Sequence, residues 1–239
     1  MLRIKLFLIS LVATLALQAQ AQTKTITILS VNDMHAAIDR FPQFVALVDS
    51  MRTVYPDLLL FSAGDNRTGN PVNDMHPEPS YPMVALMNRV GFDISAVGNH
   101  EFDGKAEGLR SMVNSAGFRY VCANMYTPDT MRLHIEPYKI FEIDGIRIAV
   151  LGLLQQGVSG LPDTHPANVK DMVFRPLKQV ADRYSWLRDQ CDVFVLLAHE
   201  EHDACIEFIH QYPYPDVLIG SHTHRRIEGT EIHNGVLVT

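Results

Sequence analysis

The decapeptide ISAVGNHEFD, at residues 94–103, joins a short apolar run to a cluster of polar side chains. The run over 94–97 is β-rich and predicts a buried strand. The glycine that follows lets the chain turn, so that Asn99, His100 and Glu101 are exposed together at the end of the strand. Open α/β sheets place their ligand sites at the carboxyl ends of strands. This stretch therefore predicts a functional site at a strand end.

The same order of an apolar run followed by polar side chains recurs along the chain, and it alternates with helical patterns. Strands are expected at 25–31, 58–62, 94–97, 138–143, 146–151, 193–197, 217–219 and 236–238. Helices are expected at 41–55, 81–90, 106–116 and 174–188. The alternation indicates an α/β fold, and the Asp144-Gly145 turn predicts an antiparallel hairpin that makes the sheet arrangement mixed.

Residue types that commonly bind metals follow five of the expected strands. They are Asp33 and His35, Asp65, Asn99 with His100 and Glu101, His199, and His222 with His224. Oxygen and imidazole donors without thiolates suit Zn, Mn, Fe, Co or Ni. The set is too large for one tetrahedral ion and fits two ions that share a bridging carboxylate. Each motif alone has an ordinary alternative, such as a polar turn, a helix N-cap or a solvated histidine. The joint pattern is what favours a dinuclear centre.

The composition excludes several classes of protein. Lys and Arg number 20 against 27 Asp and Glu, which gives a formal net charge of −7. An acidic chain lacks the basic surface that duplex nucleic acid requires, so duplex nucleic acid is not an expected partner. The 3 cysteines exclude a disulfide scaffold and a Cys-rich zinc module. The hydrophobic fraction of 47% is typical of a globular domain.

The N-terminus has the pattern of a secretory signal peptide over residues 1–21. Arg3 and Lys5 precede an apolar run over 6–17, and Ala19-Gln20-Ala21 resembles a cleavage site. The apolar run is too short to cross the ~30 Å of a hydrocarbon core comfortably, so a membrane span is not expected. We therefore expect an exported chain, periplasmic or secreted, whose mature domain covers residues 22–239.

The motifs together resemble the calcineurin-like metallophosphoesterase superfamily and, within it, the catalytic N-terminal domain of the bacterial 5′-nucleotidase family. The segments that carry the resemblance are ILSVNDMH (28–35), SAGDNRTGNP (62–71), MN (87–88) with GFD (91–93), GNHEFD (98–103), LAH (197–199), IGSHTH (219–224) and NG (234–235). The resemblance implies an α/β fold, a four-layer α/β/β/α sandwich with mixed sheets, for residues 22–239.

The resemblance also implies a role for each site residue. Asp33, His35 and His224 would hold one divalent ion, and Asn99, His199 and His222 would hold a second. Asp65 would bridge the two ions. His100 would face the phosphate, oriented by Asp103, for which the alternative role is the N-cap of the helix that follows. Substrate contacts are expected from Asn99, His100 and Arg67, although Arg67 equally fits a turn cap.

The implied activity is metal-dependent hydrolysis of phosphoesters by a hydroxide activated between two metals, most simply a 5′-nucleotidase-type phosphomonoesterase acting on nucleotides outside the cytoplasm. A 2′,3′-cyclic-nucleotide phosphodiesterase and a nucleotide-sugar diphosphatase would use the same metals. A non-catalytic, metal-loaded binding half of a split protein is the alternative of another class. The intact pair of His100 and Asp103 favours the enzyme.

The sequence departs from the family pattern at three places. Ser221 stands where a glycine is common before the two histidines, a change that we expect to be tolerated. Glu200, Glu201 and His202 follow His199 where the family usually has a glycine; we expect the carboxylates to be solvated and rank His202 as a weak extra site candidate. The catalytic domain is expected to be incomplete at its C-terminal end, with the nucleotide-binding domain absent and possibly encoded separately. The strand at 236–238 would then present an unpaired edge that another chain could pair with.

Overall fold

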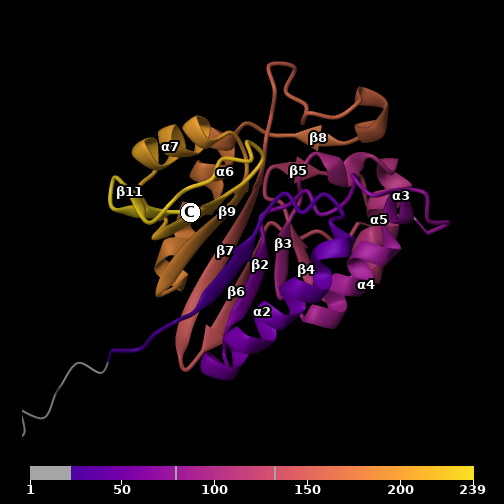
Figure 1. The fold of residues 1–239 in the computed structure, drawn as a ribbon. Coiled ribbons are helices and arrows are strands. Elements are labelled where there is room, and N and C mark those ends of the chain that lie inside the picture. The colour runs from indigo at the N-terminus through magenta and orange to yellow at the C-terminus, as the bar shows by residue number, and fades with distance from the viewer. Residues whose placement is uncertain (1–22, 79, 132) are drawn as a thin grey trace, which may run out of the picture.

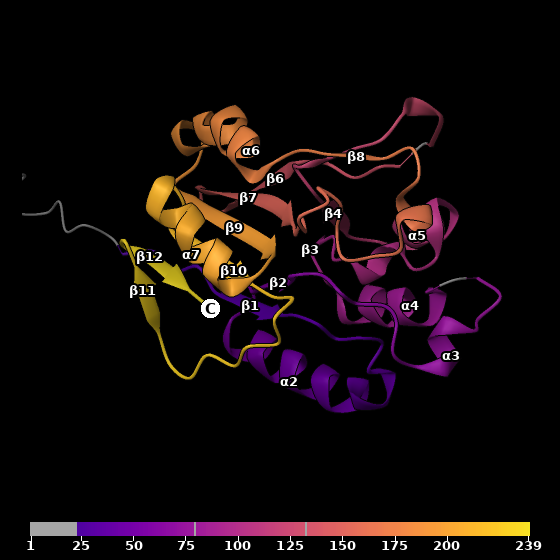
Figure 2. The same cartoon turned by 90° about the horizontal axis from the view of Figure 1, so that it is seen from above.

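The computed structural model describes residues 23–78, 80–131 and 133–239. Two β-sheets face each other, and helices cover the outer face of each sheet (Figures 1 and 2). The strand order is β1-β2-β3-β4 in one sheet and β11-β12-β10-β9-β7-β6 in the other. The fold is therefore the α/β/β/α sandwich that the family resemblance implies, and the expected signal peptide over 1–21 lies outside the described residues.

The first sheet is parallel throughout. Its strands are β1 (Ile28–Val31), β2 (Leu59–Ser62), β3 (Ile94–Ala96) and β4 (Arg119–Val121). The chain connects them through helices α2 (Phe41–Val54), α3 (Pro71–Asp74), α4 (Tyr81–Val90) and α5 (Lys105–Ser115). On β2, Leu60 packs with the helices, whereas Leu59 and Phe61 pack against the second sheet. This strand is covered on both faces, which explains why its sequence is a continuous apolar run.

The second sheet is mixed, because antiparallel strands flank a parallel centre. Its strands are β6 (Tyr138–Ile143), β7 (Ile146–Leu154), β9 (Val193–His199), β10 (Val217–Gly220), β11 (Glu231–His233) and β12 (Val236–Val238). Helices α6 (Leu177–Tyr184) and α7 (His202–Gln211) cover its outer face (Figure 2). Val150, Val195 and Leu197 of this sheet are buried between the two sheets.

Two elements differ from the sequence expectation. The helix expected at 174–188 begins later, because β5 (Met125–Tyr126) pairs with β8 (Val173–Phe174) and Pro176 precedes α6. The α-helix ends at Tyr184 and continues as a 3-10 helix over Ser185–Gln190. The expected unpaired edge at 236–238 is wrong. A hairpin through Asn234 and Gly235, both at positive φ, adds β11, so that β12 lies between β10 and β11.

The hairpin expected around Asp144-Gly145 forms as β6 and β7. Helix α7 and strand β4 were not expected from the sequence: α7 mixes polar and apolar residues, and β4 is only 3 residues long and begins at Arg119. Among the described residues, no helix combines the length and the apolar character that crossing a membrane requires.

Candidate metal centre

The loops that follow β1, β2, β3, β9 and β10 meet at one edge of the sandwich. The backbone N–H of His35 donates to the carbonyl of Asp65 at 2.9 Å, which joins the first two loops. The backbone N–H of His222 lies 3.1 Å from each carboxylate oxygen of Asp33, which joins the loop after β10 to the loop after β1. Residues far apart in sequence therefore share one site, as the strand-end pattern predicts.

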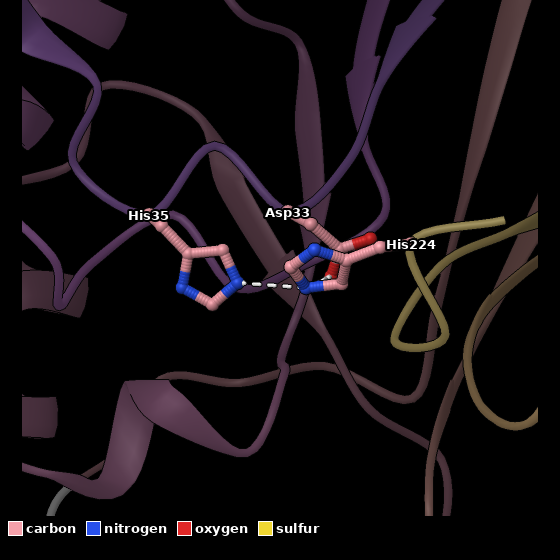
Figure 3. Close-up of side chains that lie close together, drawn as sticks. All are labelled: Asp33, His35 and His224. Carbon is pink, nitrogen blue, oxygen red and sulfur yellow. Dashed lines mark hydrogen bonds and ion pairs between the residues drawn. The ribbon is translucent and has the colours of Figure 1, made fainter. Parts of the chain in front are cut away.

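The first cluster contains Asp33, His35 and His224, each of which offers an atom within 4.8 Å of the others (Figure 3). The Nε2 atoms of His35 and His224 are 3.1 Å apart. Nε2 of His224 lies 3.9 Å from Oδ1 of Asp33. Figure 3 shows His35 and His224 reaching toward each other from separate loops, with Asp33 behind them.

The second cluster contains Asp65, His199 and His222, again within 4.8 Å of one another. Oδ1 of Asn99 lies 2.9 Å from Nε2 of His199 and 3.1 Å from Nδ1 of His222, so Asn99 belongs to the same cluster. Nε2 of His199 lies 3.2 Å from Oδ2 of Asp65. The same oxygen lies 3.9 Å from Nε2 of His35, so the Asp65 carboxylate stands between the two clusters.

The donor chemistry of these residues fits divalent cations. Nδ1 of His35 lies 3.1 Å from the carbonyl of Thr68, and Nδ1 of His199 lies 3.0 Å from the carbonyl of Ala63. A carbonyl only accepts, so these Nδ1 atoms carry a proton and the Nε2 atoms point into the clusters, where a deprotonated Nε2 could bind a metal. Without a cation, a protonated Nε2 of His199 donates to Asp65; a shared cation would replace that proton and bind the Asp65 and Asn99 oxygens as well.

Backbone strain is concentrated in the same loops. Positive φ angles occur at Asp33 (47°), His35 (44°), Asp65 (51°), His222 (76°) and His224 (52°). Each such residue costs of the order of 1–3 kcal/mol and persists only where the surrounding structure imposes it. Strain at this many ligand candidates indicates that the loops are shaped by the site.

His100 and Asp103 form a pair beside the clusters. Nδ1 of His100 lies 2.7 Å from Oδ2 of Asp103, and the Thr68 hydroxyl donates to the same oxygen at 2.7 Å. The alternative N-cap role for Asp103 is not observed, because the N-cap of α5 is Gly104. The hydrogen bond to Asp103 raises the pKa of His100 above its ordinary value, the charge of Asp65 adds to the effect, and burial opposes it.

Burial and mutual contacts shift the pKa values of Asp65, His199 and His222. Burial, the largest single effect on Asp65, pushes its pKa up, but the hydrogen bond and charge of His199 outweigh burial and leave that pKa lowered. Burial pushes the pKa of His199 down, and the bond to Asp65 outweighs it, so the pKa of His199 is raised. Burial and the charge of His199 lower the pKa of His222. Both acidic and basic partners are thus held partly away from water.

Two expectations about neighbouring acidic residues need correction, and a third acidic residue gains a contact. Glu101 is not exposed beside Asn99 and His100 but completely buried, because its carboxylate turns inward to accept backbone N–H groups. Glu200 is buried rather than solvated, and this burial raises its pKa to about 7. Glu201 is 56% exposed, as expected, but its carboxylate lies 3.5 Å from Nε2 of His222.

The two remaining candidates are Arg67 and His202. Arg67, expected to contact substrate or cap a turn, is only 5% exposed. Its guanidinium packs against Gly104, where an added Cβ would lie 2.3 Å from Nη1. Its substrate contact stays a prediction. His202 begins α7, its Nε2 lies 3.8 Å from Oε2 of Glu231, and it belongs to none of the ligand groups among the described residues.

Sequence reasoning missed two residues that contact the candidate ligands. The carbonyl of Asp163 accepts from Nδ2 of Asn99 at 3.0 Å, which orients the Asn99 oxygen toward the histidines. The Ser221 hydroxyl lies 2.7 Å from Nδ1 of His199. Ser221 could have been found from its place directly before His222, whereas no motif marks Asp163 in its loop.

The sequence is similar to a known family and to known proteins over most of its length. The model of the family described as calcineurin-like phosphoesterase matches residues 26–226. Protein UshA of Yersinia enterocolitica is 31% identical over 228 residues, which cover 84% of this chain and 41% of UshA. A 5′-nucleotidase of Vibrio cholerae is 30% identical over 195 residues, covering 76% of this chain and 34% of that protein. The chain thus spans about two fifths or less of the length of these relatives.

Solved structures share the fold. An NAD nucleotidase from Haemophilus influenzae superposes with a TM-score of 0.77 at 22% identity, covering 90% of this chain and 44% of that one. A 5′-nucleotidase precursor from Thermus thermophilus gives a TM-score of 0.74 at 21% identity, covering 90% of this chain and 48% of that one. At this level of identity the similarity establishes the sandwich architecture.

Proposed function

Because the chain belongs to the calcineurin-like phosphoesterase family, we propose that it is a metal-dependent phosphoester hydrolase whose substrate is a nucleotide. The observation that carries the proposal is the position of the Asp65 carboxylate, with Oδ2 3.2 Å from His199 and 3.9 Å from His35. A carboxylate between two ligand clusters is the arrangement that two-metal hydrolysis requires. The 5′-nucleotidase relatives support a nucleotide monophosphate as the substrate.

Two divalent ions are the proposed cofactors. Asp33, His35 and His224 would hold one, Asn99, His199 and His222 the other, and Asp65 would contact both. When bound, such ions supply positive charge for the phosphoryl oxygens and a water of lowered pKa. Several ions remain candidates, namely Zn, Mn, Fe, Co and Ni, because mixed nitrogen and oxygen donors suit all of them.

His100 supplies the proton transfer in this proposal. Its raised pKa favours the protonated imidazolium, and Asp103 holds Nδ1, which leaves Nε2 free to donate. A proton given to the leaving oxygen of the substrate offsets the charge that develops there, an effect worth typically ~10²–10⁴-fold in rate. Asp103 acts through His100 by fixing the ring orientation, and Thr68 steadies Asp103.

Recognition of the nucleoside is proposed to need a further part. The relatives are more than twice as long as the segment that this chain matches. We propose a C-terminal nucleotide-binding domain, attached or separately encoded, that grips the base and ribose while the present residues act on the phosphate. We also propose export to the periplasm or medium, supported by the signal-like residues 1–21.

The test is a substrate panel with purified protein and added Mn²⁺ or Zn²⁺. The panel contains an aryl phosphate, a nucleoside 5′-monophosphate, a 2′,3′-cyclic nucleotide and a nucleotide sugar. We expect hydrolysis of the aryl phosphate and the monophosphate that a chelator abolishes and that Asp65→Asn lacks. Preference for the cyclic nucleotide or the nucleotide sugar would instead support the phosphodiesterase or diphosphatase alternatives. Metal binding without any turnover would reject the enzyme and support a non-catalytic binding half.

A further inference from the structure

We propose that Glu101 is a positioning residue, whose buried carboxylate fixes the loop carrying Asp65 against the loop carrying Asn99 and His100. The inference rests on the proposed function only in that Asp65 and Asn99 are taken as metal ligands. Glu101 itself offers no atom to either ligand cluster. Its effect on the metals would be exerted entirely through the backbone of the two loops.

The contacts of Glu101 span both loops. Oε2 accepts the backbone N–H of Asp65 at 2.9 Å and that of Gly98 at 2.6 Å. Oε1 accepts the backbone N–H of Asn66 at 2.8 Å. Asp65 and Asn66 follow β2, whereas Gly98 follows β3. One side chain therefore joins the ends of two neighbouring strands at the point where their ligand candidates begin.

The loop after β2 and the loop after β3 are in close contact. A Cβ placed on Gly98 would lie 2.2 Å from Oδ1 of Asp65 and 2.5 Å from its backbone nitrogen. The backbone N–H of His100 donates back to Oδ1 of Asp65 at 2.9 Å. The Asp65 carboxylate is thus located by the second loop, and the second loop is held by Glu101. A shift of either loop would move Asp65 relative to Asn99.

The chemistry requires a carboxylate at this position. Three N–H groups converge on two oxygens, and both oxygens must act as acceptors. Glutamine has the same shape but replaces one acceptor by an NH₂ donor, which would face an N–H donor. Because the side chain is 0% exposed, water cannot replace the lost bond. Glu101→Gln therefore perturbs the link between the loops with a minimal change of volume.

The experiment measures metal binding and backbone protection in Glu101→Gln, with Asp93→Asn as the matched control. Asp93 also joins β2 to the start of β3, since Oδ2 accepts the backbone N–H of Leu60 at 2.7 Å, but at the opposite end of β3 from the site. Mn²⁺ binding is followed by titration and by the electron paramagnetic resonance signal of a coupled pair. Hydrogen exchange of the Asp65, Asn66 and Gly98 amides is measured on metal-free protein.

We expect Glu101→Gln to bind Mn²⁺ about 10–100-fold more weakly than wild type, the range typical of residues that orient metal ligands. The coupled-pair signal should be lost, and at least one of the three amides should exchange faster, whereas Asp93→Asn should keep wild-type Mn²⁺ affinity. Glu101→Ala, which removes all three acceptors, is the second variant and should be affected more severely.

Two results would overturn the inference: unchanged Mn²⁺ affinity and coupling in a folded Glu101→Gln protein, or fast exchange of all three amides in the wild type. A wild-type chain that binds a coupled Mn²⁺ pair but hydrolyses no phosphoester would refute the proposed function and leave the role of Glu101 to the metal measurements. A wild-type chain that binds no Mn²⁺ would refute both.

Discussion

Replacement of Gly98 by alanine tests the close approach of the two ligand loops. The added Cβ would lie 2.2 Å from Oδ1 of Asp65, and ordinary contact begins at 3.4 Å, so the carboxylate must retreat by 3.4 − 2.2 = 1.2 Å. Gly98 does not have a positive φ angle, so the effect of the substitution is steric. Catalytic groups tolerate about 0.5 Å of misplacement, and a shift of 1 Å costs on the order of 10²-fold in rate.

We therefore expect Gly98→Ala to lower the rate of aryl phosphate hydrolysis by about 100-fold. Overpacking should also cost about 1–3 kcal/mol of stability, which thermal melting of the metal-free protein reports. The control is Gly220→Ala, at the end of β10 beside the same site, where the nearest atoms to a new Cβ are 3.5 and 3.7 Å away. A folded Gly98→Ala protein with a rate within twofold of wild type would refute the reasoning.

Three further predictions follow from the site and the core. Asp103→Asn should lower the pKa of His100 toward its ordinary value, because the hydrogen bond that Nδ1 of His100 donates to Asp103 is the main cause of the upward shift; nuclear magnetic resonance titration of the metal-free protein measures this, and an unchanged pKa would contradict it. Removal of metal should lower the melting temperature by about 5–10 °C relative to protein with free metal at 100 times its Kd. At that concentration, binding to the native state alone raises the free energy of unfolding by about 2.7 kcal/mol. Cys122 and Cys205 should react with a thiol reagent only after unfolding, because both are buried and burial raises the pKa of both thiols, that of Cys122 to about 12; prompt labelling of native protein would count against this.

The residues at the strand ends could be predicted because each follows directly after an apolar run in the sequence. The β2 run is apolar throughout since both its faces are covered, and the chain must turn where the run ends at Gly64-Asp65. Parallel strands then bring Asp33, Asp65 and Asn99 to one edge, whatever the intervening helices are. The α/β class follows from the same alternation of strands and helices, whereas the four-layer arrangement was implied by the family resemblance.

The direction of individual polar side chains could not be predicted. Glu101 follows the site candidates Asn99 and His100 in sequence, yet its carboxylate turns inward because backbone N–H groups of a distant loop need an acceptor. Glu200 is buried by packing that the sequence order does not reveal. The backbone carbonyl of Asp163, 64 residues away in sequence, accepts the hydrogen bond that orients Asn99. These features depend on tertiary contacts, and no periodicity or motif encodes them.

The prediction of an unpaired edge at 236–238 was wrong for a different reason. Strand β11 contains Glu231 and His233, which carry little β-strand signal, and it exists because the turn at Asn234-Gly235 folds it onto β12. The turn was visible in the sequence, but its preceding strand was not. Exposure of Ile232 at 67% shows that this edge strand buries little apolar surface.

The central claim is that two cations share the Asp65 carboxylate. Anomalous diffraction from a crystal soaked in Mn²⁺ tests it most directly. We predict two peaks about 3.5–4 Å apart, one beside Asp33, His35 and His224, the other beside Asn99, His199 and His222, with Asp65 contacting both. A single peak, or two peaks of which only one lies near Asp65, would contradict the account.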